Sequence, residues 1–258
     1  MVSRKIKNLL VIGGANGIGK EAVSFFKKKD YRILVLDIED KKKIKNISYL
    51  KFDISKIQDH KKVLQTINKK IKKIDYVINF ARAGERKDIK AENLENWNIT
   101  MNVNLAGSFF FIRELINENI KKKLKCNIIN ISSIASKFTT RESPSYHISK
   151  AGIGIMTKLF ASEYGKKGIT INAVSPAFIL QKRYRNKFYN KKNFKFRNII
   201  NFVNKTSKIG CTNDLFELCN FVLSDKNKFI NGQDLMLDGG SNSVNPDPVA
   251  LLLNYEKI

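Results

Sequence analysis

The stretch SSIASKFTTRESPSYHISK, residues 132–150, holds three side chains whose types and spacing could act together on one oxygen atom. Lys150 follows Tyr146 by four residues, so the two side chains share one face if this segment is a helix. A free phenol titrates near ~10 and is a poor base at neutral pH, but a neighbouring ammonium favours the phenolate and lowers the pKa of the phenol. Ser133 could donate a hydrogen bond to an oxygen on which negative charge develops. Together these groups suit proton transfer to or from a reacting oxygen.

The same residues also have an ordinary structural interpretation. Tyr146 could be a core tyrosine and Lys150 a surface lysine, because the spacing Y-x-x-x-K occurs often by chance. His147 directly follows the tyrosine, so its side chain faces another direction, and we interpret it as a packing residue. The elements that position these residues must decide between the two interpretations.

Short apolar runs alternate with longer amphipathic ones along the 258 residues. The apolar runs predict strands at 8–12, 32–37, 47–53, 75–81, 126–132, 169–175 and 234–238. The amphipathic runs predict helices at 19–29, 56–73, 93–120, 144–165 and 212–224. Several strands are too apolar to leave one face in water, which indicates a mostly parallel sheet covered by helices on both faces. The sequence therefore predicts a single doubly wound α/β domain of the Rossmann type over 1–258, with a seven-stranded sheet.

The first predicted strand leads through a glycine-rich turn into a helix, in LLVIGGANGIGKEAVSFF. Gly13, Gly17 and Gly19 allow a tight turn and a close approach of the backbone to a pyrophosphate at the helix amino terminus. A glycine-rich turn without a ligand is the alternative, although a strand and a helix on either side are what a dinucleotide site requires. Asp37, at the end of the second predicted strand, can accept both hydroxyls of a ribose and repel a 2′-phosphate. We therefore expect NAD(H) as the cofactor, with NADP(H) as the alternative.

Taken in order, these motifs resemble those of the short-chain dehydrogenase/reductase family, and the resemblance covers residues 6–240. It also rests on Asp53 and Ile54 in FDIS, Asn79 and Ala81 in NFAR, Asn104 in NVNLAG, Pro176 in SPAF and the closing NGQDLMLDGG. The resemblance implies an oxidoreductase in which a nicotinamide cofactor carries the hydride while Tyr146 acts as general acid or base. It further implies that Lys150 also binds the nicotinamide ribose and that Asn104 holds a water linking Lys150 to solvent.

The resemblance assigns residues to the catalytic and cofactor sites. The implied catalytic residues are Ser133, Tyr146, Lys150 and Asn104. The implied cofactor-binding residues are Gly13, Asn16, Gly17, Ile18, Gly19, Asp37, Ile38, Asp53, Ile54, Asn79, Phe80, Ala81, Tyr146, Lys150, Pro176 and Ile179. We expect no metal in this site, and the family's usual assembly implies a homodimer or homotetramer.

Three positions depart from the family pattern. Arg82 replaces the glycine expected after Ala81, at a place where the backbone passes close to the cofactor. A bulky cation there must point outward, or towards phosphate or substrate. Ala177 replaces the glycine that follows Pro176, and Gln181 stands where a hydroxyl residue commonly helps to hold the nicotinamide side. These changes concern the geometry near the nicotinamide and leave the catalytic residues intact.

A long segment, 177–208, separates the sixth predicted strand from the last predicted helix, and a connection of this length is often a lid over the substrate. Residues 181–197 carry eight Lys or Arg in seventeen, interleaved with aromatic side chains. Such clustering suits an anionic substrate, for example a sugar nucleotide, a phosphorylated metabolite or a carrier-bound acyl group. A general lysine bias is the alternative explanation, because the whole chain has a net charge of +25.

Composition limits the other classes of function. Three cysteines without C-x-x-C spacing suit a reduced cytosolic protein, and two distant histidines offer little to a metal. No segment approaches the ~20 apolar residues of a membrane-spanning helix, and the first residues do not resemble a signal peptide. The tail 241–258 contains an apolar VALLL that we expect to pack against the domain or a neighbouring subunit.

We therefore expect a cytoplasmic enzyme that transfers hydride between NAD(H) and a secondary alcohol or ketone. One alternative is an NADPH-dependent 3-oxoacyl-carrier-protein reductase, which Asp37 disfavours. Another is a basic nucleic-acid-binding protein on a Rossmann scaffold, whose binding would weaken steeply with salt. A third is a regulator that binds the cofactor without catalysis.

Overall fold

The computed structural model describes residues 6–29, 31–40, 45–206 and 208–243. Its strands form one parallel sheet in the order β3-β2-β1-β4-β5-β6-β7. They are β1 (Asn8–Ile12), β2 (Arg32–Asp37), β3 (Ile47–Lys51), β4 (Tyr76–Asn79), β5 (Cys126–Ile131), β6 (Ile169–Pro176) and β7 (Asp234–Leu237). The winding direction reverses after β3, so β1 and β4 are neighbours at the switch point where such sheets bind ligands. The predicted doubly wound, seven-stranded sheet is confirmed.

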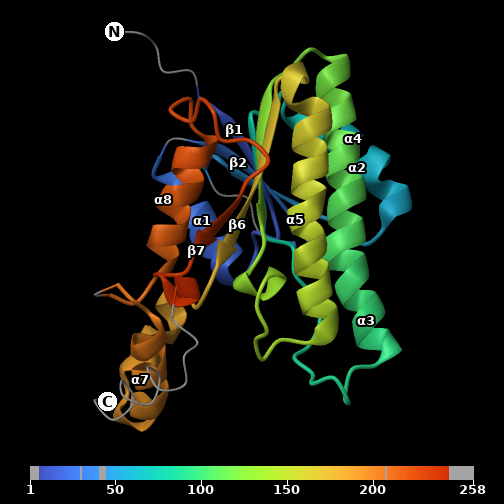
Figure 1. The fold of residues 1–258 in the computed structure, drawn as a ribbon. Helices are drawn as coiled ribbons and strands as arrows, with labels where there is room; N and C mark the ends of the chain where they lie inside the picture. The colour runs from blue at the N-terminus through green and yellow to red at the C-terminus, as the bar shows by residue number, and fades with distance from the viewer. Residues whose placement is uncertain (1–5, 30, 41–44, 207, 244–258) are drawn as a thin grey trace, which may run out of the picture.

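The helices cover both faces of this sheet. They are α1 (Gly17–Lys27), α2 (His60–Lys70), α3 (Leu94–Met101), α4 (Ser108–Lys121), α5 (Pro144–Tyr164), α6 (Arg185–Tyr189), α7 (Phe194–Val203) and α8 (Thr212–Leu223). Figure 1 shows α1 and α8 on one side of the sheet and α2, α4 and α5 on the other. Because side chains alternate along a strand, Leu9 and Val11 of β1 join the core under α1 and α8, while Leu10 and Ile12 join the core under α2, α4 and α5. This two-sided burial explains why the central strands are apolar throughout.

The helix predicted over 93–120 is interrupted. Helix α3 ends at Met101, a π-helical segment (Asn102–Gly107) follows, and α4 begins at Ser108. The backbone of Gly107 packs so closely on the strand-end loop that a Cβ there would approach the Ile54 carbonyl oxygen to 2.6 Å. A π segment inserts a residue into the helical turn and often marks a functional site. Here it turns Asn104 into the protein interior, which hydrophobic periodicity alone could not indicate.

The segment 177–208 after β6 is folded rather than an irregular loop, since it contains α6 and α7. Phe178, Phe188 and Phe196 pack against one another, with ring centroids 5.5–6.1 Å apart, and Phe188 is buried. The backbone N–H of Lys182 donates a hydrogen bond to Glu21 Oε1 at 3.1 Å, which ties this segment to α1. Figure 1 shows α7 beyond the carboxyl ends of the strands.

Two features of the sequence prediction lie at the edge of the described chain. In the predicted tail 241–258, Ser241–Ser243 forms a short 3-10 turn, and 244–258 lie outside the described residues, as do 41–44. None of the helices in the described ranges combines the length and the apolar character needed to cross a membrane.

Candidate active site

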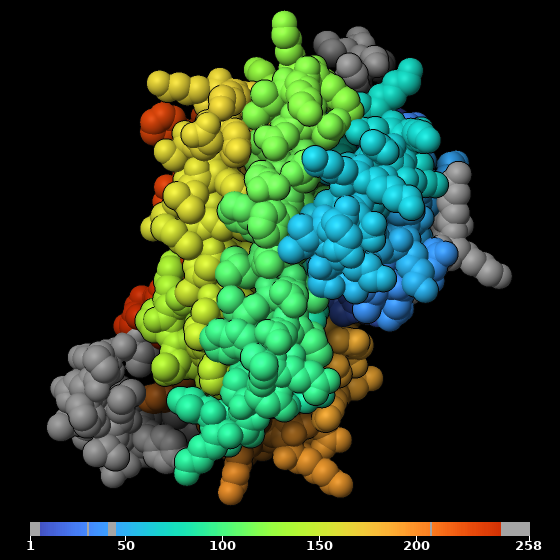
Figure 2. Space-filling view, turned by 90° about the vertical axis from the view of Figure 1, so that its right-hand side faces the viewer, coloured from blue at the N-terminus to red at the C-terminus, as the bar shows by residue number. Residues whose placement is uncertain are grey.

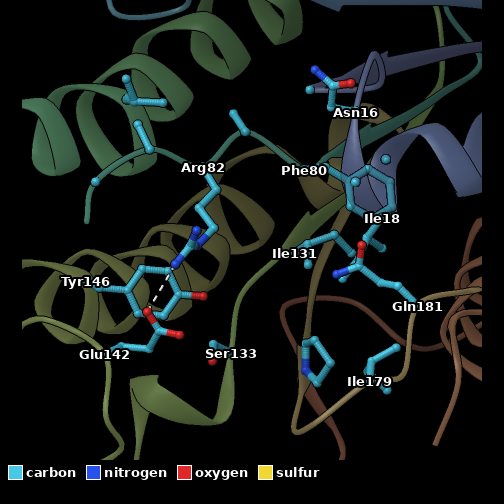
Figure 3. A pocket seen from close by; sticks show the side chains of 18 of the residues that line it. Asn16, Ile18, Phe80, Arg82, Ile131, Ser133, Glu142, Tyr146, Ile179 and Gln181 are labelled. Atoms are coloured by element: carbon cyan, nitrogen blue, oxygen red, sulfur yellow. Dashed lines mark hydrogen bonds and ion pairs between the residues drawn. The ribbon is translucent and has the colours of Figure 1, made fainter. Parts of the chain in front are cut away.

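A cavity of about 1350 Å³ opens at the carboxyl ends of the strands, between the glycine turn, the start of α5 and the segment 177–208 (Figure 3). The predicted site residues that line it are Gly13, Asn16, Gly17, Ile18, Gly19, Asp37, Ile38, Asp53, Ile54, Phe80, Ala81, Ser133, Tyr146, Lys150, Pro176 and Ile179. Asn79 and Asn104 do not line the cavity, because both side chains are buried behind its wall. The structure therefore brings together residues that lie up to 166 positions apart, from Gly13 to Ile179.

The glycine turn forms one wall, and its geometry requires glycine. Gly13 has φ +75°, and a Cβ there would meet the Phe80 and Ala81 backbone at 3.0 Å. A Cβ on Gly19 would collide with the Gly13 carbonyl. Helix α1 begins directly after this turn, so its first-turn N–H groups lie at the cavity, where an anionic phosphate is stabilised.

Asp37 ends β2 beside the glycine turn and has a defined orientation. Its Oδ2 accepts a hydrogen bond from the Ala15 N–H at 2.8 Å, and its Oδ1 accepts one from the Glu39 N–H at 3.1 Å. Each carboxylate oxygen has further acceptor capacity towards the cavity, so the group suits a pair of ribose hydroxyls. This wall fits the adenosine half of a dinucleotide.

Another part of the cavity wall is formed by the loops that follow β3 and β4. Polar side chains fix the backbone of these loops by hydrogen bonds. Asp53 Oδ1 accepts hydrogen bonds from the N–H and Oγ of Ser55, at 2.9 and 2.7 Å. Asn79 Oδ1 accepts from the Ala81 N–H at 3.0 Å, while its Nδ2 donates to Ser108 Oγ at 2.9 Å. Asn79 thus fixes the end of β4 against α4 and shapes the cavity without lining it.

Tyr146 lies in the first turn of α5, and the start of this helix is capped. The Ser143 side chain accepts from the Tyr146 N–H at 3.3 Å, and Glu92 Oε2 accepts from the N–H and Oγ of Ser145 at 3.0 and 2.7 Å. Pro144 stands at the first helical position, where its missing N–H costs nothing. These contacts set the direction in which the tyrosine enters the cavity.

Lys150 and Ser133 complete the predicted catalytic group. Lys150 Nζ lies 5.6 Å from the centroid of the Tyr146 ring and donates a hydrogen bond to the Ile131 carbonyl oxygen at 2.8 Å. Ser133 follows β5, lines the cavity and accepts a hydrogen bond from the Ala135 N–H at 3.2 Å (Figure 3). Ser132 turns the other way and donates to the Lys150 carbonyl oxygen at 3.2 Å. The three side chains do meet on one wall of the cavity.

Burial changes the pKa values of Lys150 and Tyr146, the two ionisable residues of this group. It lowers the pKa of the Lys150 ammonium to about 7, and the nearby positive charge of Arg82 acts in the same direction. Burial raises the pKa of the Tyr146 phenol above its usual value, and the Arg82 charge and hydrogen bonding from Ser133 oppose this rise. The Glu142 carboxylate adds to the rise. Tyr146 therefore needs cationic neighbours to act as a base.

Asn104 lies one layer behind the catalytic wall. Its Oδ1 accepts from the Ala83 N–H at 2.8 Å and its Nδ2 donates to Ser149 Oγ at 3.2 Å. The asparagine therefore joins the loop after β4 to α5, next to Lys150. The role in a water relay that the resemblance implies stays a prediction.

Arg82, which departs from the family pattern, points into the cavity over the ring of Tyr146. Its Cζ lies 5.0 Å from the centroid of the Tyr146 ring, and its Nη2 lies 3.0 Å from Glu142 Oε2 (Figure 3). Arg86 pairs with the other oxygen of Glu142 at 2.6 Å. Neither Glu142 nor Arg86 belongs to a motif that the sequence predicts to be functional. Glu142 is the one acidic residue between Ser133 and Tyr146, and this feature of the sequence could have indicated it as a site residue.

The segment 177–208 contributes polar groups to the cavity. Gln181 Oε1 is buried without a hydrogen-bond partner among the described residues. This oxygen and the Arg183 guanidinium are the groups nearest to the position of a Cβ on Gly17, at 4.0 and 3.7 Å. A hydrogen-bond donor of a bound dinucleotide would satisfy the glutamine oxygen, so the residues present fit such a cofactor.

Comparisons with known proteins agree with this site. The family model described as Enoyl-(Acyl carrier protein) reductase matches residues 13–242. A protein of Listeria innocua named NAD-dependent glycerol dehydrogenase is 31% identical over 245 residues, which cover 91% of this chain and 93% of that protein. The structure of ElxO with NADP bound has a TM-score of 0.83 at 27% identity and covers 93% of this chain and 100% of that one. A short chain dehydrogenase from Leptospira borgpetersenii with bound NAD+ has a TM-score of 0.81 at 25% identity and covers 92% of each chain.

The family match spans most of the chain, and the glycine turn, the Ser133–Tyr146–Lys150 group and the fold all belong to the same pattern. The chain therefore belongs to the short-chain dehydrogenase/reductase family and is an NAD(P)-dependent oxidoreductase that acts on CH–OH groups.

Proposed function

We propose that this enzyme interconverts a secondary alcohol and a ketone with NAD(H), and that its substrate carries negative charge. The observation that carries the first part is the meeting of Ser133, Tyr146 and Lys150 on one wall of a cavity whose opposite wall is the glycine turn with Asp37. This arrangement supports proton transfer beside a bound dinucleotide, because both sets of residues line the same cavity.

The residues of the chain handle the proton and the charge of the reaction. A bound nicotinamide accepts or supplies the hydride. In the oxidising direction the Tyr146 phenolate takes the proton of the substrate hydroxyl, and in the reducing direction the phenol returns it to the carbonyl oxygen. Ser133 donates a hydrogen bond to the same oxygen as charge develops on it. Lys150 stabilises the phenolate and, by the family resemblance, binds the nicotinamide ribose.

Asp37 supports the preference for NAD(H). Its carboxylate is fixed by the Ala15 and Glu39 N–H groups at the point where an adenosine ribose lies in such folds. A 2′-phosphate beside this charge would be repelled. The name of the Listeria innocua relative, NAD-dependent glycerol dehydrogenase, supports the same preference.

The charges around the cavity support an anionic substrate. Arg82 and Arg86 hold the carboxylate of Glu142, and two arginines beside the cavity support the binding of a carboxylate or phosphate group. Arg183 and Lys187 line the cavity from the segment 177–208. A sugar nucleotide, a phosphorylated metabolite and a carrier-bound acyl group all fit this chemistry, and the sequence did not choose among them.

A homodimer or homotetramer in the cytosol is part of the proposal. Ile148, Ile155 and Leu159 form an apolar row on α5, with 47%, 57% and 58% of each residue exposed. Figure 2 shows α4 and α5 side by side on this face of the molecule. We propose that a second copy of the chain covers this apolar row. Exposure of apolar side chains to water is unfavourable, and self-association would bury them.

The proposed function is tested by titrating NADH and NADPH separately into the enzyme and screening alcohols and ketones by the absorbance of the reduced cofactor. Glycerol and neutral sugars are compared with their phosphorylated counterparts. The proposal expects tighter binding of NADH than of NADPH, and higher kcat/KM for the phosphorylated compounds. Turnover that favours NADPH and acyl-carrier thioesters would support the 3-oxoacyl-carrier-protein reductase instead. Binding of a single-stranded oligonucleotide without binding of either cofactor would support the nucleic-acid alternative.

A further inference from the structure

We propose that Arg82 is a positioning residue that stabilises the phenolate form of Tyr146, in addition to Lys150. The inference rests on the proposed function, because it concerns the proton-transfer step in which Tyr146 takes part. It assigns a role to the residue that stands where the family pattern has a glycine.

The placement of the guanidinium carries the inference. Arg82 follows the end of β4, and its Cζ lies 5.0 Å from the centroid of the Tyr146 ring, closer than the 5.6 Å of Lys150 Nζ. The Arg82 guanidinium is kept there by its 3.0 Å ion pair with Glu142. The glutamate is half-buried and is held on its other oxygen by Arg86. A guanidinium on an aromatic face within this range is attracted to the ring and to any negative charge on it.

The two cations differ in how reliably they are charged. Burial lowers the pKa of the Lys150 ammonium to about 7, so its positive charge is less firmly held than that of an exposed lysine. An arginine keeps its proton at every pH at which the protein is folded. Arg82 therefore adds a second positive charge close to the Tyr146 ring. Burial raises the pKa of the phenol, and the Arg82 charge is the first influence that lowers it again.

The other groups around the phenol act in both directions. The groups that face the phenol or lie beside it in the cavity come from several elements: Ser133 after β5, Lys150 on α5, Glu142 before α5, Arg82 after β4 and Arg86 beyond Glu142. Arg183 and Lys187 also line the cavity. Hydrogen bonding from Ser133 favours the phenolate, whereas the Glu142 carboxylate disfavours it. Arg82 and Glu142 thus form an ion pair whose two members have opposite effects on Tyr146.

These opposite effects define the experiment. The full-length protein is labelled with tyrosine carrying ¹³C at the ring Cζ, and the ionisation of each tyrosine is followed by NMR as the pH is raised. The Tyr146 signal is identified by its absence in Tyr146→Phe. The variants are Arg82→Gly, Arg82→Lys, Glu142→Gln and, as the matched control, Arg86→Gln, which removes a cation from the same glutamate but leaves Arg82 in place.

The inference predicts a set of signed shifts in the pKa of Tyr146. Arg82→Gly raises it by about one unit, and Arg82→Lys recovers at least half of that rise because the charge is retained. Glu142→Gln lowers it, because the amide oxygen still accepts from Arg82 while the negative charge is gone. Arg86→Gln produces less than half of the Arg82→Gly shift. The acid limb of the pH profile for alcohol oxidation moves in the same directions.

Two results would overturn the inference. They are no rise in the pKa of Tyr146 in Arg82→Gly, and equal rises in Arg82→Lys and Arg82→Gly. Either result would mean that Arg82 acts through packing rather than through its charge. Should Arg82→Gly fail to fold, Arg82→Gln takes its place as the neutral variant in both comparisons. The titration needs no substrate, so the two proposals can fail separately. If the enzyme turns over but the pKa of Tyr146 does not shift in the variants, the inference alone is refuted. If the pKa shifts as predicted but no alcohol or ketone is turned over, the proposed function alone is refuted.

Discussion

The Asp37 carboxylate accepts a hydrogen bond from the Ala15 N–H at 2.8 Å, so the residue that is expected to select the cofactor also holds the glycine turn in place. The two tasks can be separated by charge. Asp37→Asn keeps an oxygen that can accept from Ala15, whereas Asp37→Ala removes both the acceptor and the charge.

We expect Asp37→Asn to weaken NADH binding about tenfold, because hydrogen bonds from ribose hydroxyls to a charged acceptor are lost, and to bring the NADPH affinity close to that of NADH. Asp37→Ala should weaken both cofactors further, because the turn loses its support. Isothermal titration calorimetry measures the four dissociation constants. An unchanged NADH affinity in both variants would show that Asp37 does not contact the ribose.

The buried Lys150 should make the stability of the protein depend on pH. Its pKa is about 7 in the folded protein against the ordinary value of 10.5, so between these values the unfolded chain binds more protons. The free energy of unfolding therefore increases as the pH rises from about 7 to 10.5. Below about 7, Lys150 is protonated in both states and adds no such increase. Lys150→Met lacks this dependence, so the variant should gain stability relative to the wild type most strongly at pH 7 or below, and least near pH 10.

Urea unfolding of the wild type and Lys150→Met at several pH values between 6.5 and 10 measures this difference. A stability difference that stays constant across the range would mean that the lysine is equally charged in the folded and unfolded states.

The π segment should depend on Asn104 for its stability. Asn104→Ala leaves the Ala83 N–H without a buried partner and removes the bond to Ser149 Oγ, which still donates to the Tyr146 carbonyl oxygen, and we expect a loss of about 2 kcal/mol in the free energy of unfolding. The matched control is Asn102→Ala, because Asn102 lies in the same segment but is exposed, and its replacement should cost less than about 0.5 kcal/mol. Chemical denaturation of the two variants compares them. Equal losses would show that the segment, rather than the asparagine contacts, sets the stability.

The sequence could predict the parts of this fold and site that depend on local pattern. The apolar runs predicted all seven strands to within two residues, because strands buried on both faces are apolar throughout. The spacing of Tyr146 and Lys150 predicted a shared helix face, and both side chains line one cavity. Ser133 lies with them because it follows β5, and the carboxyl ends of parallel strands meet at one edge of the sheet.

Other parts depend on contacts between distant segments, which no local pattern records. The break at Asn102–Gly107 follows from the packing of Gly107 on Ile54, more than 50 positions earlier in the chain. Arg82 could have pointed in several directions, and its partner Glu142 decides which one, 60 positions later. Asn79 was assigned to the cofactor by its motif, yet its side chain is occupied by Ala81 and Ser108.

The apolar row on α5 should hold copies of the chain together. Ile155→Glu places a charge in the middle of the proposed contact, so we expect a smaller particle than the wild type in sedimentation velocity at micromolar concentration. The matched control is Lys226→Glu, an exposed charge change outside α4 and α5, which should leave the sedimentation coefficient unchanged. A wild type that sediments as a monomer would refute the proposed assembly.

The most direct test of the account is the turnover of Tyr146→Phe. This variant keeps the ring and its packing but has no proton to give or take, so we expect kcat for alcohol oxidation to fall at least ~100-fold. The dissociation constant of NADH should stay within about twofold of the wild type, because the glycine turn and Asp37 are untouched. Oxidation by Tyr146→Phe at the wild-type rate, with NADH bound equally well, would contradict the assignment of Tyr146 as the proton-transferring group.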